Sequence, residues 1–172
     1  MWSLLFAISF FSQFRPNLPE QSSTQWQAFP KPRIVIKKSD YKLYLYCGDV
    51  LEKVYPIAVG KNKGDKEAEG DMRTPEGYFY ISQIQNSEKW THDFKDGKGE
   101  IAGAYGPWFL RLHTSKERTK SGKAWRGIGI HGTHDESSIG TAATEGCIRL
   151  RNSDLLDLKS RIRIGTEVRI VE

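Results

Sequence analysis

The chain has 172 residues, of which 38% are hydrophobic and 12% aromatic, a composition that excludes a disordered or collagen-like protein. A chain of this length buries roughly two-thirds of its extended surface as one ordinary domain, so a stable core needs no disulfide. The formal net charge of +5 suits an anionic partner such as nucleic acid, a membrane face or an acidic wall polymer, but names none of them. Because Lys and Arg are scattered rather than clustered, a solvated basic surface is an equal alternative. Our overall interpretation of the sequence includes no nucleic-acid partner.

The N-terminus carries an apolar run from Trp2 to Phe11. It is as long as the core of a signal peptide and shorter than the about 20 residues of a spanning helix. We interpret residues 1–14 as a signal-like or anchor segment and the Pro-, Gln- and Ser-rich stretch 15–32 as a linker. A strand or helix of the domain itself is the alternative. The first interpretation predicts export to the cell envelope, periplasmic or extracellular, with membrane contact only through this segment.

After the linker, polar and apolar residues alternate with a period of two, which is typical of strands. Two such runs are joined at Ser39-Asp40, and a third follows the turn at Gly48-Asp49, which predicts antiparallel hairpins. Further strand candidates are YFYISQIQ (78–85), PWFLRLHT (107–114), GIGIHGT (127–133) and EVRIVE (167–172). The polar, glycine-containing stretch 86–106 is a long excursion, and such loops tend to be functional or mobile.

One convincing helix is predicted over the sequence NSDLLDLKSRI. Its cap is Asn152 or Ser153, and Leu155, Leu158 and Ile162 form a stripe that would face the core. Because strand patterns dominate the rest of the chain, we predict a mainly β fold, a sandwich-like mixed sheet with one or two short helices.

The two cysteines differ in context. Cys47 closes an alternating run and is expected to pack as a small apolar side chain, whereas Cys147 directly follows a glycine, so we do not expect a disulfide between them. A free thiol is mostly protonated at neutral pH, and the thiolate is the nucleophile. His131 ends an extended run that would hold it rigidly, and we interpret it as the imidazole that keeps Cys147 a thiolate.

Glycines flank both of these side chains. Gly132 leaves room for substrate or for a backbone contact to the ring of His131. Gly146 allows a tight turn that would direct the backbone N–H groups of Gly146 and Cys147 at a developing oxyanion.

Two alternatives to this interpretation remain open. The first is a buried thiol with an unrelated surface imidazole. The second is a zinc site formed by His131, His134 and Cys147, with an open fourth position. A metal would sequester the thiolate, so we expect neither a metal nor another cofactor.

Three motifs, taken together, resemble one family. RTPEGYF (73–79), HGT (131–133) and GCIRLRNSD (146–154) are similar to motifs in the catalytic domain of L,D-transpeptidases, the cysteine enzymes of bacterial peptidoglycan. The resemblance covers residues 33–172, which we interpret as the catalytic domain. It implies a mixed, mostly β fold with the site in a cleft, in agreement with the strand pattern.

The resemblance also implies a role for each motif residue. Cys147 would be the nucleophile and His131 its general base, with the backbone of Gly132 helping to orient the histidine. Gly146 corresponds to the glycine before the nucleophile. Arg149 would be a substrate-carboxylate contact or, as we favour, a structural brace.

The sequence departs from the family pattern next to the nucleophile. Many members have Ser or Thr and then a second histidine before the Gly-Cys pair, where this chain has Thr144 and Glu145. A carboxylate there would oppose a thiolate. We favour a view in which Glu145 donates its backbone N–H to the oxyanion site and turns its side chain to solvent.

The resemblance implies a reaction on peptidoglycan stem peptides. Cys147 would attack the bond between the L-centre of the diamino acid and the terminal D-alanine of a tetrapeptide, and the thioester would pass to an amine acceptor. The alternatives are an L,D-carboxypeptidase, a cysteine amidase that releases a wall-anchored lipoprotein, and a wall-binding module without activity.

Overall fold

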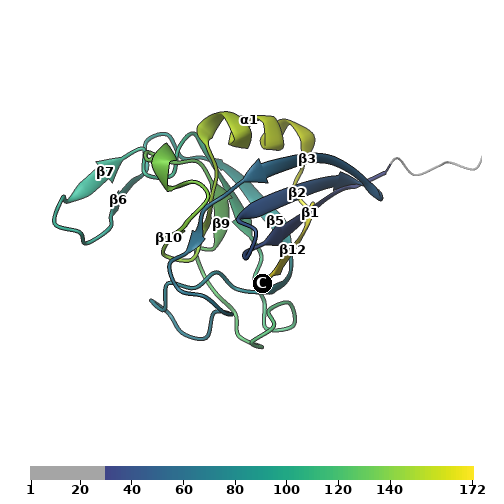
Figure 1. Cartoon of the computed structure of the whole chain (residues 1–172), viewed down its shortest axis with the longest axis horizontal. Helices are drawn as coiled ribbons and strands as arrows, with labels where there is room; N and C mark the ends of the chain where they lie inside the picture. Colours follow the sequence, from purple (N-terminus) through teal and green to yellow (C-terminus); the bar gives the residue numbers. More distant parts are fainter. Residues whose placement is uncertain (1–29) are drawn as a thin grey trace, which may run out of the picture.

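The period-two pattern forms the first strands of a mixed sheet in the computed structural model, which describes residues 30–172 (Figure 1). The strands, in chain order, are β1 (Pro32–Lys37), β2 (Lys42–Cys47), β3 (Val50–Pro56), β4 (Val59–Gly60), β5 (Gly77–Asn86), β6 (Thr91–Asp93), β7 (Glu100–Ala102), β8 (Trp108–Leu112), β9 (Gly129–His131), β10 (Ala142–Thr144), β11 (Ile148–Arg149) and β12 (Glu167–Val171). The helices are the short 3-10 helix η1 (Glu136–Ser138) and α1 (Asn152–Arg161). The expected mainly β fold with one or two short helices is therefore confirmed.

Eight of the strands form one sheet in the order β11-β9-β8-β5-β12-β1-β2-β3. The pairs β1–β12 and β11–β9 are parallel and the other neighbours are antiparallel, so the sheet is mixed. The two hairpins expected near the N-terminal end of the domain, β1–β2 and β2–β3, are confirmed. Two smaller pairs, β4–β10 and β6–β7, lie outside this sheet.

Alternation along the strands fills one core. Ile34, Ile36, Leu43 and Leu45 are fully buried, because every second residue of β1 and β2 points to the same face. Helix α1 adds Leu155 and Leu158 to this cluster, and Ile162, directly after the helix ends, adds the third residue of the apolar stripe expected from the sequence.

The cap of α1 differs from our expectation. The helix begins at Asn152 with Arg151 as the cap residue, and no side chain caps it. The side-chain amide of Asn152 instead binds the backbone of Thr133. Its Oδ1 accepts from the N–H of Thr133 at 2.9 Å, and its Nδ2 donates to the carbonyl oxygen of Thr133 at 3.0 Å. These two bonds fix the start of α1 to the loop after β9.

The excursion over residues 86–106 contains a short hairpin. Strands β6 and β7 pair antiparallel, and Figure 1 shows the hairpin projecting from one end of the molecule. The base of the hairpin is closed by a hydrogen bond from the backbone N–H of Gly103 to the carbonyl oxygen of Trp90, at 3.1 Å. Short strands separated by glycines give weak periodicity, and for this reason the sequence indicated only a loop.

The motif RTPEGYF (73–79) spans the end of the loop before β5 and the start of that strand, and two of its side chains fix the loop to the rest of the domain. Oγ1 of Thr74 accepts the backbone N–H of Gly60 at 2.8 Å, and Glu76 forms a buried ion pair with Lys38 at 2.9 Å. This loop passes beside the turn that carries the nucleophile candidate.

The predicted signal-like segment 1–14 and nearly all of the linker 15–32 lie outside the described residues. Within residues 30–172, no helix has the length and apolar character needed to cross a membrane. Both cysteines are free, and Cys47 is half-buried, with its sulfur 3.4 Å from the carbonyl oxygen of Pro30.

Candidate active site

Two parallel strands bring the candidate catalytic residues together. In the pair β9–β11, Ile130 lies opposite Ile148 and His131 lies opposite Arg149. Both isoleucines are fully buried in the core. Because successive side chains point to opposite faces, His131, Arg149 and the residue before β11, Cys147, lie on the other face.

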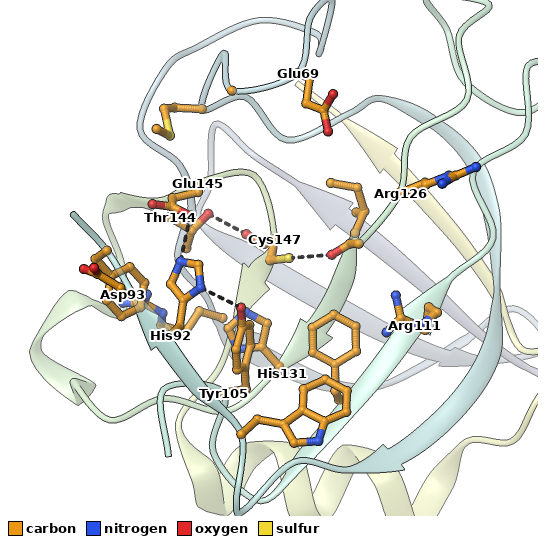
Figure 2. A pocket seen from close by; sticks show the side chains of 18 of the residues that line it. Glu69, His92, Asp93, Tyr105, Arg111, Arg126, His131, Thr144, Glu145 and Cys147 are labelled. Carbon is orange, nitrogen blue, oxygen red and sulfur yellow. Dashed lines mark hydrogen bonds and ion pairs between the residues drawn. The ribbon is translucent and has the colours of Figure 1, made fainter. Parts of the chain in front are cut away.

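That face opens into a cleft of about 750 Å³, a size typical of small-molecule sites. His131 and Cys147 both line it. Figure 2 shows Cys147 in the middle, with Arg111 and Arg126 on one side and Glu145 on the other. His131 and Cys147 therefore lie on the same side of the domain, as a joint role in catalysis requires.

The ring of His131 is held on three sides. It is buried, stacks on Phe109 at 5.5 Å between ring centroids, and meets the edge of Tyr105 at 5.0 Å. Its Nδ1 atom lies 2.7 Å from the carbonyl oxygen of Gly132. Burial lowers the pKa of His131 to about 3, and the contact with Gly132 opposes that shift, so the imidazole is neutral at rest.

The sulfur of Cys147 is a neutral thiol at rest. It donates to the carbonyl oxygen of Gly127 at 3.3 Å (Figure 2). Burial raises the pKa of this thiol to about 11, although a hydrogen bond from the backbone of Gly129 and the charge of Arg149 act in the other direction. Our expectation of a resting thiolate beside an imidazole was therefore wrong: desolvation disfavours the charged form of both groups.

A glycine is required immediately before the nucleophile candidate. Gly146 has a φ of +132°, and a Cβ on it would lie 2.8 Å from the carbonyl oxygen of Arg73. Thr144 closes the same turn, because its hydroxyl accepts the N–H of Gly146 at 3.1 Å and donates to the carbonyl oxygen of Cys147 at 2.6 Å. The turn is thus fixed by main-chain geometry and one hydroxyl.

This geometry changes which backbone N–H groups can stabilise an oxyanion, because we expected those of Gly146 and Cys147. The N–H of Gly146 is occupied by Thr144 and is not available to a substrate. Within residues 30–172, the backbone N–H groups of Glu145 and Cys147 have no hydrogen-bond partner. Those two groups are the main-chain donors that remain next to the sulfur.

Arg149 makes the contacts of a brace. It is 5% exposed, and its Nη1 donates to Oγ of Ser138 at 3.0 Å. Its guanidinium carbon lies 5.7 Å from the ring centroid of Phe94 in the projecting hairpin. Arg149 also lines the cleft, so a contact with a substrate carboxylate stays a prediction.

The side chain of Glu145 does not turn freely to solvent, contrary to our expectation. Its Oε2 atom lies 3.0 Å from Nε2 of His92, and the two side chains are 36% and 29% exposed. His92 in turn contacts the hydroxyl of Tyr105 at 3.1 Å through Nδ1. A hydrogen-bond partner explains why the carboxylate stays at the cleft.

Sequence reasoning missed His92, Tyr105, Phe109 and Asn152 as parts of this site. Three of them lie in or beside the excursion 86–106 and one begins the helix, so no short motif joins them to Cys147. The usable signal was the length of the excursion, which marked it as functional or mobile without indicating which side chains reach the cleft.

The zinc alternative finds no support in the described part of the chain. Among residues 30–172, no group of three or more His, Cys, Asp or Glu side chains is arranged to hold a metal ion. His134 instead faces the ring of Phe94, at 5.3 Å between centroids.

Comparisons with known proteins agree on one family. The sequence model of the L,D-transpeptidase catalytic domain (YkuD) matches residues 31–170. The YkuD protein of Bacillus subtilis strain 168 is 36% identical over 155 residues, which cover 90% of this chain and 71% of that protein. The YkuD protein of Bacillus licheniformis is 36% identical over 138 residues, or 80% of this chain and 64% of its own length.

A solved structure supports the fold. The chain resembles L,D-transpeptidase 3 of Mycobacterium tuberculosis, crystallised with a faropenem-derived adduct, with a TM-score of 0.61 at 18% identity. The match covers 83% of this chain and 61% of that one.

Proposed function

Because this chain belongs to the L,D-transpeptidase catalytic domain family, we propose that it is an enzyme that transfers acyl groups between peptidoglycan stem peptides, with Cys147 as its nucleophile. One observation carries this proposal: strands β9 and β11, paired in register, direct His131 and Cys147 into the same cleft. A half-buried thiol and a neutral imidazole with a free nitrogen in one cleft are the starting point for nucleophilic acyl transfer.

The first half-reaction needs a proton transfer at the moment of attack. Nδ1 of His131 faces a carbonyl oxygen, which only accepts, so Nδ1 carries the hydrogen and Nε2 keeps a lone pair. Nε2 takes the proton from Cys147 as the sulfur attacks the carbonyl carbon between the L-centre and the terminal D-alanine. The proton then passes to the leaving amine, which departs as D-alanine and leaves a thioester on the sulfur.

The oxyanion that develops on the substrate carbonyl needs hydrogen-bond donors that have no partner within the protein. The unpartnered backbone N–H groups of Glu145 and Cys147 support a main-chain oxyanion site, and one such donor is worth roughly 3 kcal/mol. Thr144 contributes indirectly, because it holds the turn that presents these donors.

The second half-reaction returns the enzyme to rest. An acceptor amine attacks the thioester, the new amide bond forms, and the thiolate leaves and is reprotonated through His131. The substrate would be peptidoglycan, which places the protein in the cell envelope, and the surplus of basic residues suits an anionic wall. A wall-anchored lipoprotein is a second acyl partner with the same chemistry.

Intact-mass spectrometry tests this function. The protein is incubated with a carbapenem and, separately, with a tetrapeptide muropeptide. We expect one adduct per chain in each case, lost in Cys147→Ala and retained in Cys47→Ala, the matched variant at the other free cysteine. An unmodified wild type would leave the wall-binding module without activity as the alternative. An adduct that survives in Cys147→Ala would show that another residue is the nucleophile.

The products then identify the acceptor. Cross-linked dimers of the muropeptide support transfer to an amine. Trimmed monomers alone would instead identify a hydrolase that uses water on the same thioester.

A further inference from the structure

Three side chains on one wall of the cleft form a connected array that the mechanism above does not use. Oε2 of Glu145 lies 3.0 Å from Nε2 of His92, and Nδ1 of His92 lies 3.1 Å from the hydroxyl of Tyr105. A carboxylate only accepts, so Nε2 of His92 donates to Glu145, and the tautomer with its only hydrogen on Nε2 accepts the hydrogen of the Tyr105 hydroxyl at Nδ1. The result is a carboxylate–imidazole–hydroxyl sequence, the arrangement by which other enzymes move a proton from a hydroxyl group.

The array lies beside the reacting sulfur. All three residues line the cleft with Cys147, and the ring of Tyr105 contacts the ring of His131 at 5.0 Å. Burial, the largest cause, and the charge of Glu145 raise the pKa of Tyr105, so this hydroxyl keeps its proton at rest and can act only as a shuttle. Tyr105 is half-buried at the cleft, as are His92 and Glu145, so a substrate group can reach this array through the hydroxyl of Tyr105.

Charged side chains of both signs line the cleft, among them Lys66, Glu69, Lys95 and Arg149. Figure 2 shows Glu145 and Asp93 with His92 on one side of Cys147, and Arg111 and Arg126 on the other. A cationic group is attracted to the acidic side and repelled from the basic side. The acyl acceptor is such a group, because an alkyl amine is an ammonium ion at neutral pH and cannot attack a thioester until it loses a proton.

We propose that Tyr105 binds the ammonium group of the acyl acceptor and removes its proton, and that His92 and Glu145 enable Tyr105 to do so. This inference rests on the proposed function. Tyr105 touches the substrate, whereas His92 and Glu145 are positioning residues that act through it. The projecting hairpin β6–β7 thus contributes to the acceptor side of the site, because His92 is the middle residue of β6.

The proton balance is as follows. The ammonium passes one proton to the oxygen of Tyr105 while the phenol proton moves to Nδ1 of His92, and Glu145 stabilises the imidazolium. The free amine forms the C–N bond, the C–S bond of the thioester breaks, and the second amine proton passes through Nε2 of His131 to the sulfur. His92 then releases its proton to water, so one proton is released for each amide formed.

The experiment separates the half-reactions and uses two acceptors. The variants are Tyr105→Phe, His92→Asn and Glu145→Gln. Thioester formation from the tetrapeptide is followed by mass, and transfer is measured to a second tetrapeptide, whose amine is cationic, and to hydroxylamine, which is mostly uncharged at neutral pH. The control is His113→Asn, an exposed histidine that stacks on Tyr80 and does not line the cleft.

We expect the ratio of the transfer rate to the tetrapeptide over the transfer rate to hydroxylamine to fall by about 10- to 100-fold in each of the three variants. His113→Asn should match wild type in all three measurements. Equal losses with both acceptors would overturn the relay and indicate a structural role. A wild type that forms no thioester would instead reject the proposed function, and the relay with it.

Discussion

Nδ1 of His131 lies 2.7 Å from the carbonyl oxygen of Gly132, and this contact fixes which ring nitrogen can act as a base. The role of Nε2 can be tested with two amides. In His131→Asn the amide can imitate Nδ1 but not Nε2, and in His131→Gln it reaches the Nε2 position without being a base. We expect both to lose at least about 100-fold in the rate of thioester formation, measured by mass with a carbapenem. Substantial activity in either variant would show that another group takes the thiol proton.

Two features make Gly146 intolerant of a side chain: its positive φ, and the carbonyl oxygen of Arg73 close to the place where a Cβ would lie. Gly165 has only the first feature, so comparing the two glycines separates the effects. In Gly146→Ala the Cβ is strained at φ +132° and meets the carbonyl oxygen of Arg73 at 2.8 Å. Gly165 also has a positive φ, +88°, but open space around it. We expect Gly165→Ala to lose about 1 to 2 kcal/mol in the free energy of unfolding and to keep its activity.

Gly146→Ala should lose more stability than Gly165→Ala in urea unfolding, and it should lose thioester formation by about 10-fold or more, because the turn moves. If the two alanine variants had equal activities, the placement of the sulfur would not depend on this turn.

The hydroxyl of Thr144 holds the nucleophile turn through two backbone groups. Thr144→Val keeps the shape and removes the hydroxyl, leaving the N–H of Gly146 and the carbonyl oxygen of Cys147 without this partner. We expect a loss of about 1 to 3 kcal/mol in the free energy of unfolding and slower thioester formation. Thr144→Ser retains both bonds and should stay close to wild type. Equal behaviour of the valine and serine variants would contradict the role of the hydroxyl.

The fold was largely predictable because its strands alternate. Ile34 and Ile36, or Leu43 and Leu45, reveal a buried face directly from their spacing. The short strands β4, β10 and β11 have two or three residues each and carry no periodic signal. Their positions follow from tertiary contacts, such as the bonds between the backbones of Ala58 and Arg149 at 2.8 and 2.9 Å.

The site was predictable only where its residues lie within one motif. Gly146 and Cys147 are adjacent, and His131 is recognisable from the glycine that follows it. The partner of Glu145 was not predictable, because His92 is 53 positions away and reaches it through a hairpin with weak periodicity. The charge state of Cys147 was mispredicted for a related reason: the sequence does not reveal burial, and burial decides the sign of the pKa shift.

The neutral thiol at rest has a consequence for stability. Burial raises the pKa of Cys147 from the ordinary 9.0 to about 11, so the folded protein holds this proton more tightly than the unfolded chain. The corresponding stabilisation is complete below about pH 9 and is lost as the pH rises to about 11. Between about pH 7.5 and about pH 10.5 this single group should remove about 2 kcal/mol from the free energy of unfolding.

Urea unfolding of three proteins at these two pH values isolates that contribution. Other groups titrate in the same range, so the informative quantity is the difference between variants rather than the decline itself. We expect Cys147→Ala to lose less stability than wild type by about 2 kcal/mol on going to the higher pH. Cys47→Ala should decline in parallel with wild type, because it retains the buried thiol. An equal decline in Cys147→Ala and wild type would mean that folding leaves the pKa of this thiol near its ordinary 9.0. A larger decline in Cys147→Ala than in wild type would mean that the folded sulfur is already a thiolate, and general-base removal of its proton by His131 would then be unnecessary.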